Sequence, residues 1–558
     1  PYDDNCNGKT NEKDALNCDI FYFDNDGDTY YASGAETQCW CDPYEKFTGV
    51  SSSDCNDGNA AVNPSADENC STGYDDNCNG QTDEQNAVNC VVFYYDGDGD
   101  NYGTNDSQCW CAAHGKYKAA VNGDCDDNDP GVHPGASVCG KDADCDGKYG
   151  DPGEACDDGN SARWDGCHQC SIEEFVVNAT LSNNQENPTL TAFSNGEFLV
   201  VWESWLQDGS ASGIFGQRYN ADGSKKGSEF QANTYTSSSQ INGRVAVLSG
   251  DGFVIVWNSF GQDGSQESVH GQMYNADGTK KGGEFQINAY TTNSQTYPDV
   301  AALAGGKFVV LWQSSGQDGA SWGVYGQRFN SDGAKDGAEF QVNTYTSSEQ
   351  SRPSVASFGD SSFVVVWQSY GADSSEFAVA GQLFDSSGAK SGNEFIVNTT
   401  SANDQKFPSV SSESSGKFVV VWQSYSAATS ADILGQRFNA GGSKAGSELT
   451  ANTFTFSDQE SPHVSMSGDG SFNVFWTSWW QDGSGEGVYG QRYNADGAKK
   501  GNEFKVNIYT SDSQRAVRSA LFPDGKFGAV WSSTSQFDGT IYDIMCQRYS
   551  SAGTKIYR

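Results

Sequence analysis

The sequence predicts an all-β protein: a seven-bladed β-propeller with four-stranded blades, preceded by a disulfide-rich, loop-rich metal-binding region. The C-terminal two-thirds repeats one text seven times, with one tryptophan per copy spaced by 55 residues and once by 54. Repeats of about this length form stacked or circular arrays. The N-terminal part instead concentrates cysteine and aspartate. We expect two Asp/Cys-rich repeats (1–73 and 74–140), a Cys-rich repeat with a linker (141–172) and the propeller (173–558).

The chain has 558 residues and is strongly acidic, with a formal net charge of −41. Nucleic-acid binding requires a basic face, so the charge argues against nucleic acid and favours cations. Residues 1–172 hold 35 of the 74 acidic side chains but only 8 of the 33 basic ones. No apolar run reaches the roughly 18 residues that would span a membrane. No signal peptide is present, yet the chain opens inside a motif that recurs at Gly73, so we expect a processed or partial form of a secreted precursor.

The N-terminal part contains two copies of one cysteine-rich unit, since YDDNCNGKTNE recurs as YDDNCNGQTDE and QCWC occurs in both. Sixteen of the 17 cysteines lie between Cys6 and Cys170. A dense, even set of this kind indicates disulfides made in an oxidising compartment. The pairing stays open, because the six cysteines of one copy allow 15 connectivities. Zinc is a less favoured alternative, because no Cys or His quartet has finger spacing.

Two loops alternate aspartate with small or flexible residues: Asp24, Asp26 and Asp28 in the first copy, and Asp96, Asp98 and Asp100 in the second. Such a loop can curl its oxygens around one hard cation, and calcium takes about six to eight oxygen ligands. The pattern departs from an EF-hand, because Thr29 or Asn101 stands where that motif has glycine. Further calcium ligands must therefore come from other loops. We expect them at Asp54, Asn56, Asp57, Asp76, Asn79, Asp83 and Glu84, and at Asp124, Asp126, Asn128 and Asp129.

The texts DCDDNDPGVHPGA, DDNCNGQTDE and YYDGDGDNYG resemble the Asp-rich metal-binding repeats of secreted bacterial and protist proteins. DPGEACDDGN, followed by DGC, is similar to the Cys-rich repeats found beside them. The resemblance covers about residues 1–170 and implies cation binding and a surface location. The alternative left open is that Asp, Asn and Gly mark solvated turns.

Each C-terminal copy carries four strand signals between turns. Pro353–Ser357 is a short strand, and Phe363–Gln368 is a continuous apolar run that should be buried on both faces. Val324–Phe329 alternates and turns tightly into Glu339–Asn343. Four short antiparallel strands make a propeller blade.

The two ends of the repeat region predict how the ring closes. The region begins with an isolated EFxVN strand, Glu174–Asn178, and ends after Ile544–Tyr549 with no such strand following. We therefore expect the first strand to complete the blade that contains Trp531. This arrangement covers an exposed edge and closes the ring.

Most repeated side chains fit a structural role. The seven tryptophans each end a buried run, and the repeated glutamines and asparagines fit polar ties between strands or blades. The position three after each tryptophan is aromatic in five copies: Trp205, Phe260, Tyr370, Tyr425 and Trp479. These rings either face one mouth of the propeller, where they would stack on sugars or anchor proteins, or pack between blades. The text FVVVWQSYG with GVYGQRF resembles tandem propeller repeats of large secreted or cell-surface proteins.

Few residues differ from the repeat in a way that suggests a chemical role; His270, Glu376, His463 and Cys546 are the ones that stand out. No paired carboxylates or nucleophile motif is evident. We therefore predict that the protein is not an enzyme. Cys546 replaces a glycine, either as an inert buried residue or as a thiol for an intermolecular disulfide. Asn-x-Ser/Thr sequons at Asn69, Asn105, Asn178 and Asn398 are possible glycan sites.

Together these features predict an extracellular, calcium-stabilised structural or adhesive surface protein, such as a subunit of a filament or sheath. The propeller would contact other copies of the chain or other extracellular proteins. A carbohydrate-binding, lectin-like propeller is the alternative, and a secreted glycan-active enzyme is less favoured.

Overall fold

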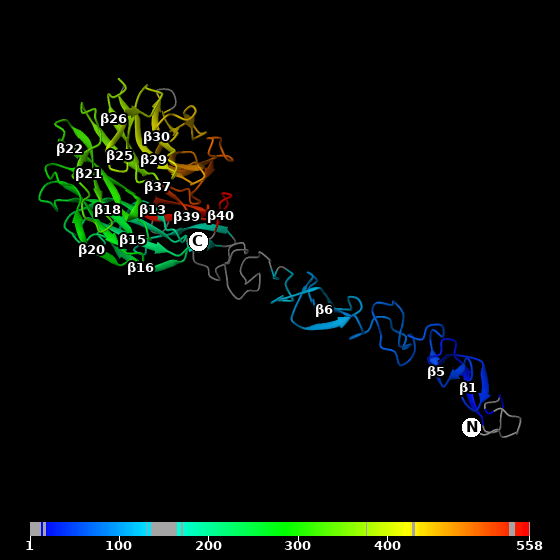
Figure 1. Cartoon of the computed structure of the whole chain (residues 1–558). Coiled ribbons are helices and arrows are strands. Elements are labelled where there is room, and N and C mark those ends of the chain that lie inside the picture. Colours follow the sequence, from blue (N-terminus) through cyan, green and yellow to red (C-terminus); the bar gives the residue numbers. More distant parts are fainter. Residues whose placement is uncertain are drawn as a thin grey trace. The chain divides into compact units, whose positions relative to one another are not determined.

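The computed structural model describes residues 10, 13–14, 18–130, 132–134, 165–168, 171–374, 376–426, 430–534 and 542–556. The chain divides into two compact units, Pro1–Ser161 and Ala162–Arg558. The described elements are β-strands apart from one 3-10 turn, η1 (Ala304–Gly306), as Figure 1 shows. Within these ranges, no helix has the length and apolar character needed to cross a bilayer.

In the first unit, each copy forms a three-stranded antiparallel sheet and a two-stranded parallel ladder. The sheet orders are β3–β1–β4 and β8–β6–β9, and the ladders are β2–β5 and β7–β10. The strands of the first copy are β1 (Asp19–Phe23), β2 (Tyr30–Ala32), β3 (Thr37–Trp40), β4 (Phe47–Gly49) and β5 (Ser51–Asp54). Those of the second copy are β6 (Val91–Tyr95), β7 (Tyr102–Gly103), β8 (Ser107–Trp110), β9 (Tyr117–Ala119) and β10 (Val121–Asn122).

Disulfides hold this unit together. Cys18–Cys39 and Cys90–Cys109 occupy equivalent places inside the two copies. Cys55–Cys78 and Cys70–Cys111 join the first copy to the second. The described apolar core is small, comprising Phe21, Val62, Ala87, Ala119 and Val132. The predicted disulfide framework is confirmed, and it compensates for a core too small to stabilise the unit alone.

The second unit consists of seven antiparallel sheets, six of them four-stranded, that follow one another around a common centre in Figure 1. The predicted all-β fold of repeated four-stranded sheets is confirmed. The first strands are β13 (Gln185–Ala192), β17 (Gln240–Val247), β21 (Gln295–Ala302), β25 (Gln350–Ser357), β29 (Gln405–Ser412), β33 (Gln459–Met466) and β37 (Gln514–Leu521). The second strands are β14 (Phe198–Trp205), β18 (Phe253–Phe260), β22 (Phe308–Ser315), β26 (Phe363–Tyr370), β30 (Phe418–Ser426), β34 (Phe472–Trp479) and β38 (Phe527–Thr534).

The third strands are β15 (Ser212–Tyr219), β19 (Glu267–Tyr274), β23 (Trp322–Phe329), β27 (Phe377–Phe384), β31 (Ser430–Phe438), β35 (Glu486–Tyr493) and β39 (Tyr542–Tyr549). The fourth strands are β16 (Lys225–Gln231), β20 (Lys280–Gln286), β24 (Phe340–Gln341), β28 (Lys390–Ile396), β32 (Leu449–Thr450) and β36 (Phe504–Lys505). The predicted strand Glu339–Asn343 is thus shortened to β24, an edge strand paired on one side only.

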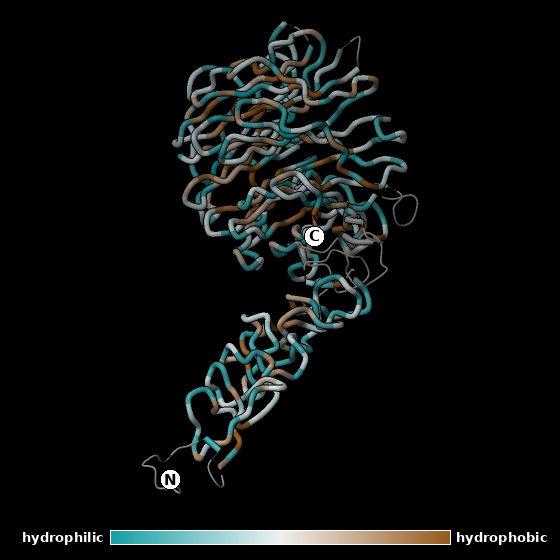
Figure 2. Tube along the Cα trace, turned by 90° about the vertical axis from the view of Figure 1, so that its right-hand side faces the viewer, coloured by the Kyte–Doolittle hydropathy of each residue, from teal (hydrophilic) through white to brown (hydrophobic). Residues whose placement is uncertain are grey.

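The second strand of each sheet supplies the core. The repeated tryptophans Trp202, Trp257, Trp312, Trp367, Trp422, Trp476 and Trp531 are all fully buried. Each apolar cluster combines residues of two neighbouring sheets, so a sheet buries its faces only against its neighbours. Figure 2 shows that this unit contains long hydrophobic stretches of chain alternating with hydrophilic ones.

The first and last sheets also pack against each other as neighbours. Strand β12 (Ser171–Val176) pairs with β39, with Phe175 opposite Cys546, and β39 pairs with β38, which contains Trp531. The pairing predicted for the first strand is therefore present. Strand β11 (Asp165–His168) continues this sheet beyond β12, and β40 (Lys555–Ile556) also pairs with β39. Apolar side chains of the first and last sheets share one buried cluster, which includes Trp202 and Ile544.

Polar side chains join successive sheets at equivalent points. Asn233 accepts a hydrogen bond from the Ile214 N–H and donates one to Gln240 of the next sheet at 3.0 Å. Asn288 and Gln295 repeat this contact at 3.1 Å. A glutamate on or beside the fourth strand accepts a backbone N–H of the preceding sheet at each junction, for example Glu394 from Thr344 at 2.6 Å. The repeated Gln and Asn residues are therefore structural ties.

The junction between the last and first strands uses the same glutamate tie. Buried Glu174 accepts hydrogen bonds from the backbone N–H groups of Ile508 and Tyr509. We expect Glu174→Ala to lower the free energy of unfolding by about 1–3 kcal/mol, because it leaves buried donors unpaired. Urea unfolding measures the loss, and Glu394→Ala at an internal junction is the matched comparison. A Glu174→Ala protein as stable as the wild type would contradict this junction.

Candidate functional site

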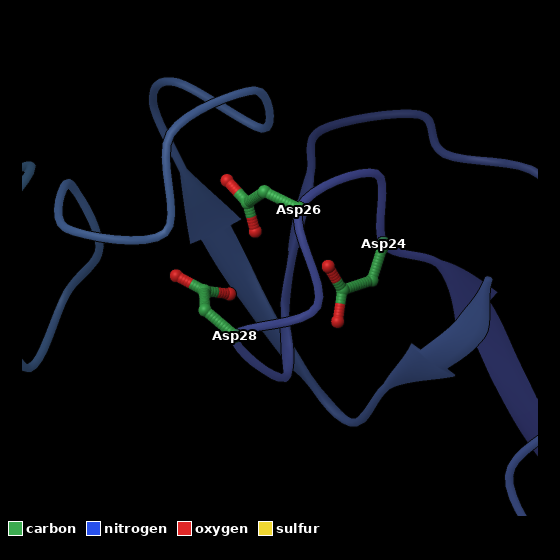
Figure 3. Close-up of side chains that lie close together, drawn as sticks. All are labelled: Asp24, Asp26 and Asp28. Atoms are coloured by element: carbon green, nitrogen blue, oxygen red, sulfur yellow. The ribbon is translucent and has the colours of Figure 1, made fainter.

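Two groups of aspartates lie on equivalent loops of the first unit. Asp24, Asp26 and Asp28 follow β1, and Asp96, Asp98 and Asp100 follow β6. In each group, one carboxylate oxygen from every residue lies within 4.8 Å of the others. Figure 3 shows the first group on one curled loop with its carboxyl groups close together. The structure thus brings together both predicted triplets.

The first aspartate of each loop shapes the backbone. Asp24 accepts hydrogen bonds from the Gly27 N–H at 2.6 Å, the Thr29 N–H at 2.9 Å and the Thr48 hydroxyl at 2.6 Å. Thr29 has a φ of 80°, in the left-handed region for which glycine is the usual residue. The loop therefore makes the turn that an EF-hand makes with glycine. Asp96 repeats the arrangement with Gly99 and Asn101.

The remaining aspartates present oxygens that have no partner in the protein. Both carboxylate oxygens of Asp26 and the Oδ2 atoms of Asp28 and Asp54 are buried without a hydrogen bond. Asp54 ends β5, and its other oxygen accepts the Asn56 N–H at 2.7 Å. The second copy leaves equivalent oxygens unpaired, on Asp98, Asp100 and Asp124. Buried carboxylate oxygens without partners are costly unless a cation binds them.

The electrostatics of both groups agree with this geometry. Burial, followed by repulsion from Asp28, raises the pKa of Asp26. Burial, with added repulsion from Asp28, also raises the pKa of Asp54. Burial raises the pKa values of Asp98 and Asp124 as well. The sites therefore carry negative charge that the protein balances poorly, and every donor is a carboxylate, which suits a hard divalent cation.

The other predicted ligands beside these loops act mainly on the backbone. Asp57 accepts the Asn25 N–H at 3.1 Å and so holds the first loop against the turn after β5. In the second copy this position is Asp127, which accepts the Gly97 N–H at 2.7 Å. Asp127 was missed among the predicted residues, although aligning the two copies places it opposite Asp57. The N–H groups of Asn128 and Asp129 both bond to the Asp126 carbonyl and close that turn.

The predicted acidic turn at Asp76, Asn79, Asp83 and Glu84 is not gathered into a group of the kind formed by the two aspartate triplets. Asn79 donates to Glu84, and Asp83 lies 3.5 Å from His114 of the second copy. Buried Asp76 accepts from the Thr72 hydroxyl at 2.5 Å. Its N–H donates to Glu68, a residue that the sequence did not single out. Glu68 keeps one buried oxygen without a partner, and burial raises its pKa.

The aromatic residues three positions after the tryptophans lie at one end of the second strands. Trp205, Phe260 and Tyr370 are 44–49% exposed, whereas Tyr425 and Trp479 are half-buried. The two copies without an aromatic there carry one directly opposite on the third strand, Trp322 facing Ser315 and Tyr542 facing Thr534. Every sheet therefore has an aromatic ring at this end.

Two predicted glycan sites are corrected by the structure. Asn178 is buried, and its amide donates to Asp543 at 2.8 Å while its carbonyl accepts the Ile544 N–H. Asn398 is buried and bonded in the same way to Asp373 and Val379. A glycan on either amide would break these ties. Asn105 is exposed and Asn69 half-buried, so the prediction stays open for both.

The two thiols without a partner differ in their surroundings. Cys546 is fully buried, and burial raises its pKa to about 12, which fits an inert packing residue. Cys41 is half-buried and unpaired among the described cysteines. Its counterpart in the second copy, Cys111, bonds to Cys70 of the preceding copy.

Comparison with known proteins agrees with the site. The model of the family described as "Putative metal-binding motif", named Cu-binding_MopE, matches residues 2–12, 54–84 and 124–149. The N-terminal repeats carry this metal-binding motif. The matched segments contain Asp54 and Asp124, which the structure places with unpaired oxygens beside the aspartate loops. No curated protein sequence matches the chain.

Several solved structures are similar to part of this chain at low TM-scores. A protein of unknown function from Dyadobacter fermentans is 9% identical, with a TM-score of 0.42, over 69% of this chain and 98% of that one. The NanB sialidase from Streptococcus pneumoniae is 9% identical, with a TM-score of 0.38, over 54% and 66%. An α-L-arabinofuranosidase from Lactobacillus brevis is 9% identical, with a TM-score of 0.32, over 49% and 96%.

The prediction that the protein is not an enzyme is withdrawn, because a sialidase and an arabinofuranosidase stand among these similar structures. At the identities and scores above, the likeness assigns neither a substrate nor a reaction to this chain.

Removing one predicted ligand from each loop tests the metal sites. We expect Asp26→Asn with Asp98→Asn to weaken calcium binding by about tenfold or more, because each loses charge and a donor oxygen. Isothermal titration measures the affinity, and Asp19→Asn, an exposed acid on β1, is the control. Equal affinity in the double variant and the control would contradict the assignment.

The raised pKa values give a second test. Aspartates with raised pKa values hold protons at higher pH, and the ion must displace these protons to bind. Calcium affinity should therefore fall on acidification, beginning above the ordinary aspartate pKa of 3.8. Titrations in buffers of different ionisation enthalpy count the protons released. An affinity that stays constant down to the ordinary value would contradict the electrostatics.

Proposed function

We propose that the protein is an extracellular structural or adhesive protein in which a calcium-stabilised N-terminal arm carries a closed seven-bladed β-propeller that serves as a contact platform. The observation that carries the proposal is the set of buried, unpartnered carboxylate oxygens at equivalent places in both N-terminal copies. They lie in a unit held by disulfides with little apolar core. Such a unit gains stability from any cation that binds its folded form.

Calcium fits the donors better than copper does. Both groups consist of aspartates alone, without histidine or thiolate. Copper favours imidazole and sulfur ligands, whereas calcium takes carboxylate and carbonyl oxygens in flexible geometry. Asp26, Asp28 and Asp54 would hold one ion, and Asp98, Asp100 and Asp124 another. The bound ion supplies the positive charge that these carboxylates lack.

The propeller interpretation rests on contacts between the first and last sheets. Strand β12 completes the sheet of β37, β38 and β39. Arg548 of β39 donates to the backbone carbonyls of Ala221 and Asp222 in the first sheet. Arg437 makes the equivalent contact with Ala495 between two internal sheets. A rigid ring of similar blades offers repeated surfaces for protein contacts.

The cysteines support the proposed location and partners. Stable disulfides form in oxidising compartments, which supports an extracellular protein. Cys41 occupies the position that in the second copy makes a bond between copies. It is therefore suited to a disulfide with a cysteine of another copy of the repeat, and a second chain in an assembly would supply one.

A carbohydrate-binding propeller is the second candidate. The exposed rings of Trp205, Phe260 and Tyr370 provide stacking surfaces for sugars. A cavity of about 230 Å³ is lined by Glu186, Glu460 and Glu486, whose carboxylates can accept hydroxyl hydrogen bonds. Trp479 donates to Glu460 at 3.2 Å, so the cavity adjoins the aromatic end of the sheets.

Assembly is tested with the thiols. In calcium, without reductant, we expect oligomers on sedimentation and on non-reducing gels, and their loss in Cys41→Ser. Cys546→Ser is the matched control, because its buried thiol is not available for linkage. A monodisperse monomer under these conditions would count against the structural proposal.

Glycan-array binding that disappears in a triple alanine variant of Trp205, Tyr370 and Trp479 would instead favour the carbohydrate-binding alternative.

A further inference from the structure

A cavity of about 340 Å³ lies among the first strands of the seven sheets, and every one of these strands contributes to its lining. Two positions of each strand line it, two and four residues after the repeated glutamine. The first position holds Asn187, Asn242, Tyr297, Arg352, Phe407, Ser461 and Ala516. The second holds Thr189, Arg244, Asp299, Ser354, Ser409, His463 and Arg518. Across the seven copies, the first position holds six different residue types and the second holds five.

A bulge brings these side chains to the cavity. In each sheet, the pairing of the first strand with the second shifts register just after the repeated glutamine. In the sheet of Gln240, for example, the shift lies between Ile241 and Arg244. The residue inside the bulge has a positive φ in all seven copies, between 51° and 58°, and is never glycine. Bulges redirect side chains and occur next to functional sites, and left-handed non-glycine residues are uncommon elsewhere. The expectation that the blades lack distinctive chemistry is therefore wrong at this position.

Most residues at the second position have a structural task. Four of the seven accept a hydrogen bond from the next first strand, donated by the backbone N–H of the residue after the equivalent position; Ser354, for example, accepts from Val410 at 3.4 Å. Asp299 accepts from Val355 at 2.9 Å, and Ser409 accepts from Val464 at 3.3 Å. His463 accepts the Ser519 N–H through Nδ1 at 3.2 Å. Arg244 and Arg518 cannot take this role, because a guanidinium has no acceptor.

The three arginines are held in place without a close ion pair, although Asp299 attracts Arg244 and Arg518 from a longer distance. Arg244 and Arg518 each donate one hydrogen bond, at 2.8 and 2.9 Å, to the carbonyl of the preceding residue. The guanidinium of Arg352 lies 3.6 Å from the centre of the Tyr297 ring. Among the described residues, no carboxylate oxygen lies within 4.0 Å of their nitrogens. All three are half-buried and line the cavity.

The charges in the cavity do not cancel. Burial, with repulsion from Arg244, lowers the pKa of Arg518 to about 9, so it stays charged at neutral pH. Burial and the charges of Arg518 and Arg244 lower the pKa of His463, which is therefore neutral. Asp299 is the one carboxylate in the lining, and backbone N–H groups already occupy both its oxygens. A chain of net charge −41 thus concentrates a positive charge at this one place.

We propose that this cavity binds a small organic anion, whose carboxylate, sulfate or phosphate group pairs with Arg244, Arg352 and Arg518. Guanidinium groups match such oxyanions in shape and in hydrogen-bond donors. The volume is at the low end for ligand pockets, and the aromatic ring of Tyr297 and the amides of Asn187 and Asn242 can contact the rest of the molecule. This site goes beyond the proposed function, because it is an anion site among the first strands; it adjoins the glutamate-lined cavity, with which it shares Asn187, Ser461 and Ala516.

Titration calorimetry of the full chain with glucuronate, sulfate, phosphate and uncharged glucose tests the proposal. We expect at least one anion to bind and to raise the melting temperature, glucose to have no effect, and added salt to weaken binding. Arg244→Gln and Arg518→Gln should each lower the affinity about tenfold, because one charged contact is lost. Arg515→Gln, on the same strand as Arg518 but paired with Glu186, should leave it unchanged.

Comparing the anions identifies the preferred group, since glucuronate supplies a carboxylate on a sugar ring while sulfate and phosphate are inorganic. Anion binding that persists unchanged in both arginine variants would overturn the proposal. So would equal binding of glucose and glucuronate, or no binding by any anion of the panel. If the arginine variants fail to fold, the comparison of charged and uncharged ligands with the wild-type chain decides the question.

Discussion

Repulsion between carboxylates is the main constraint on the N-terminal unit. These carboxylates are packed into loops that have almost no apolar core. Asp26, Asp28 and Asp54 each leave at least one buried oxygen without a partner. Disulfides hold the loops in position but do nothing to reduce the charge. In the second copy, Lys118 lies 3.7 Å from Asp96, which already accepts backbone N–H groups. A bound cation would remove the repulsion and supply the missing partners at once, so we expect folding and metal binding to be coupled in this unit.

The second unit depends on contacts between neighbouring sheets. Each sheet exposes two apolar faces until its neighbours cover them, so no sheet is stable alone and each junction matters equally. Fully buried tryptophans supply the apolar contact, while the Asn–Gln and glutamate ties set the register between sheets. Glu174 and β12 extend the same contacts to the junction between the last and first sheets. These contacts repeat while the bulged first strands vary, and Arg244 and Arg518 stand where other copies have a residue that accepts a backbone hydrogen bond from the next strand.

Much of this architecture could be predicted because it repeats. Alternating and continuous apolar runs located the strands, and the isolated Glu174–Asn178 segment predicted the pairing of β12 with β39. The aspartate triplets were recognised because their ligands are close in sequence. Asp127 and Glu68 were missed because their roles depend on contacts between distant loops. The arginine cavity was missed for a similar reason: Arg244 and Arg518 are 274 residues apart, and only the bulge turns both toward the same space. Disulfide pairing could not be predicted, since two of the bonds in the described part of the chain join different copies.

Calorimetry of the whole chain, with calcium and then with a chelator, tests the central claim most directly, namely that the N-terminal unit is stabilised by bound calcium. The account predicts that the chelator lowers the melting transition of this unit and leaves that of the seven-sheet unit unchanged, and that calcium but not copper restores it. A trace that the chelator does not alter, or one restored by copper alone, would contradict it.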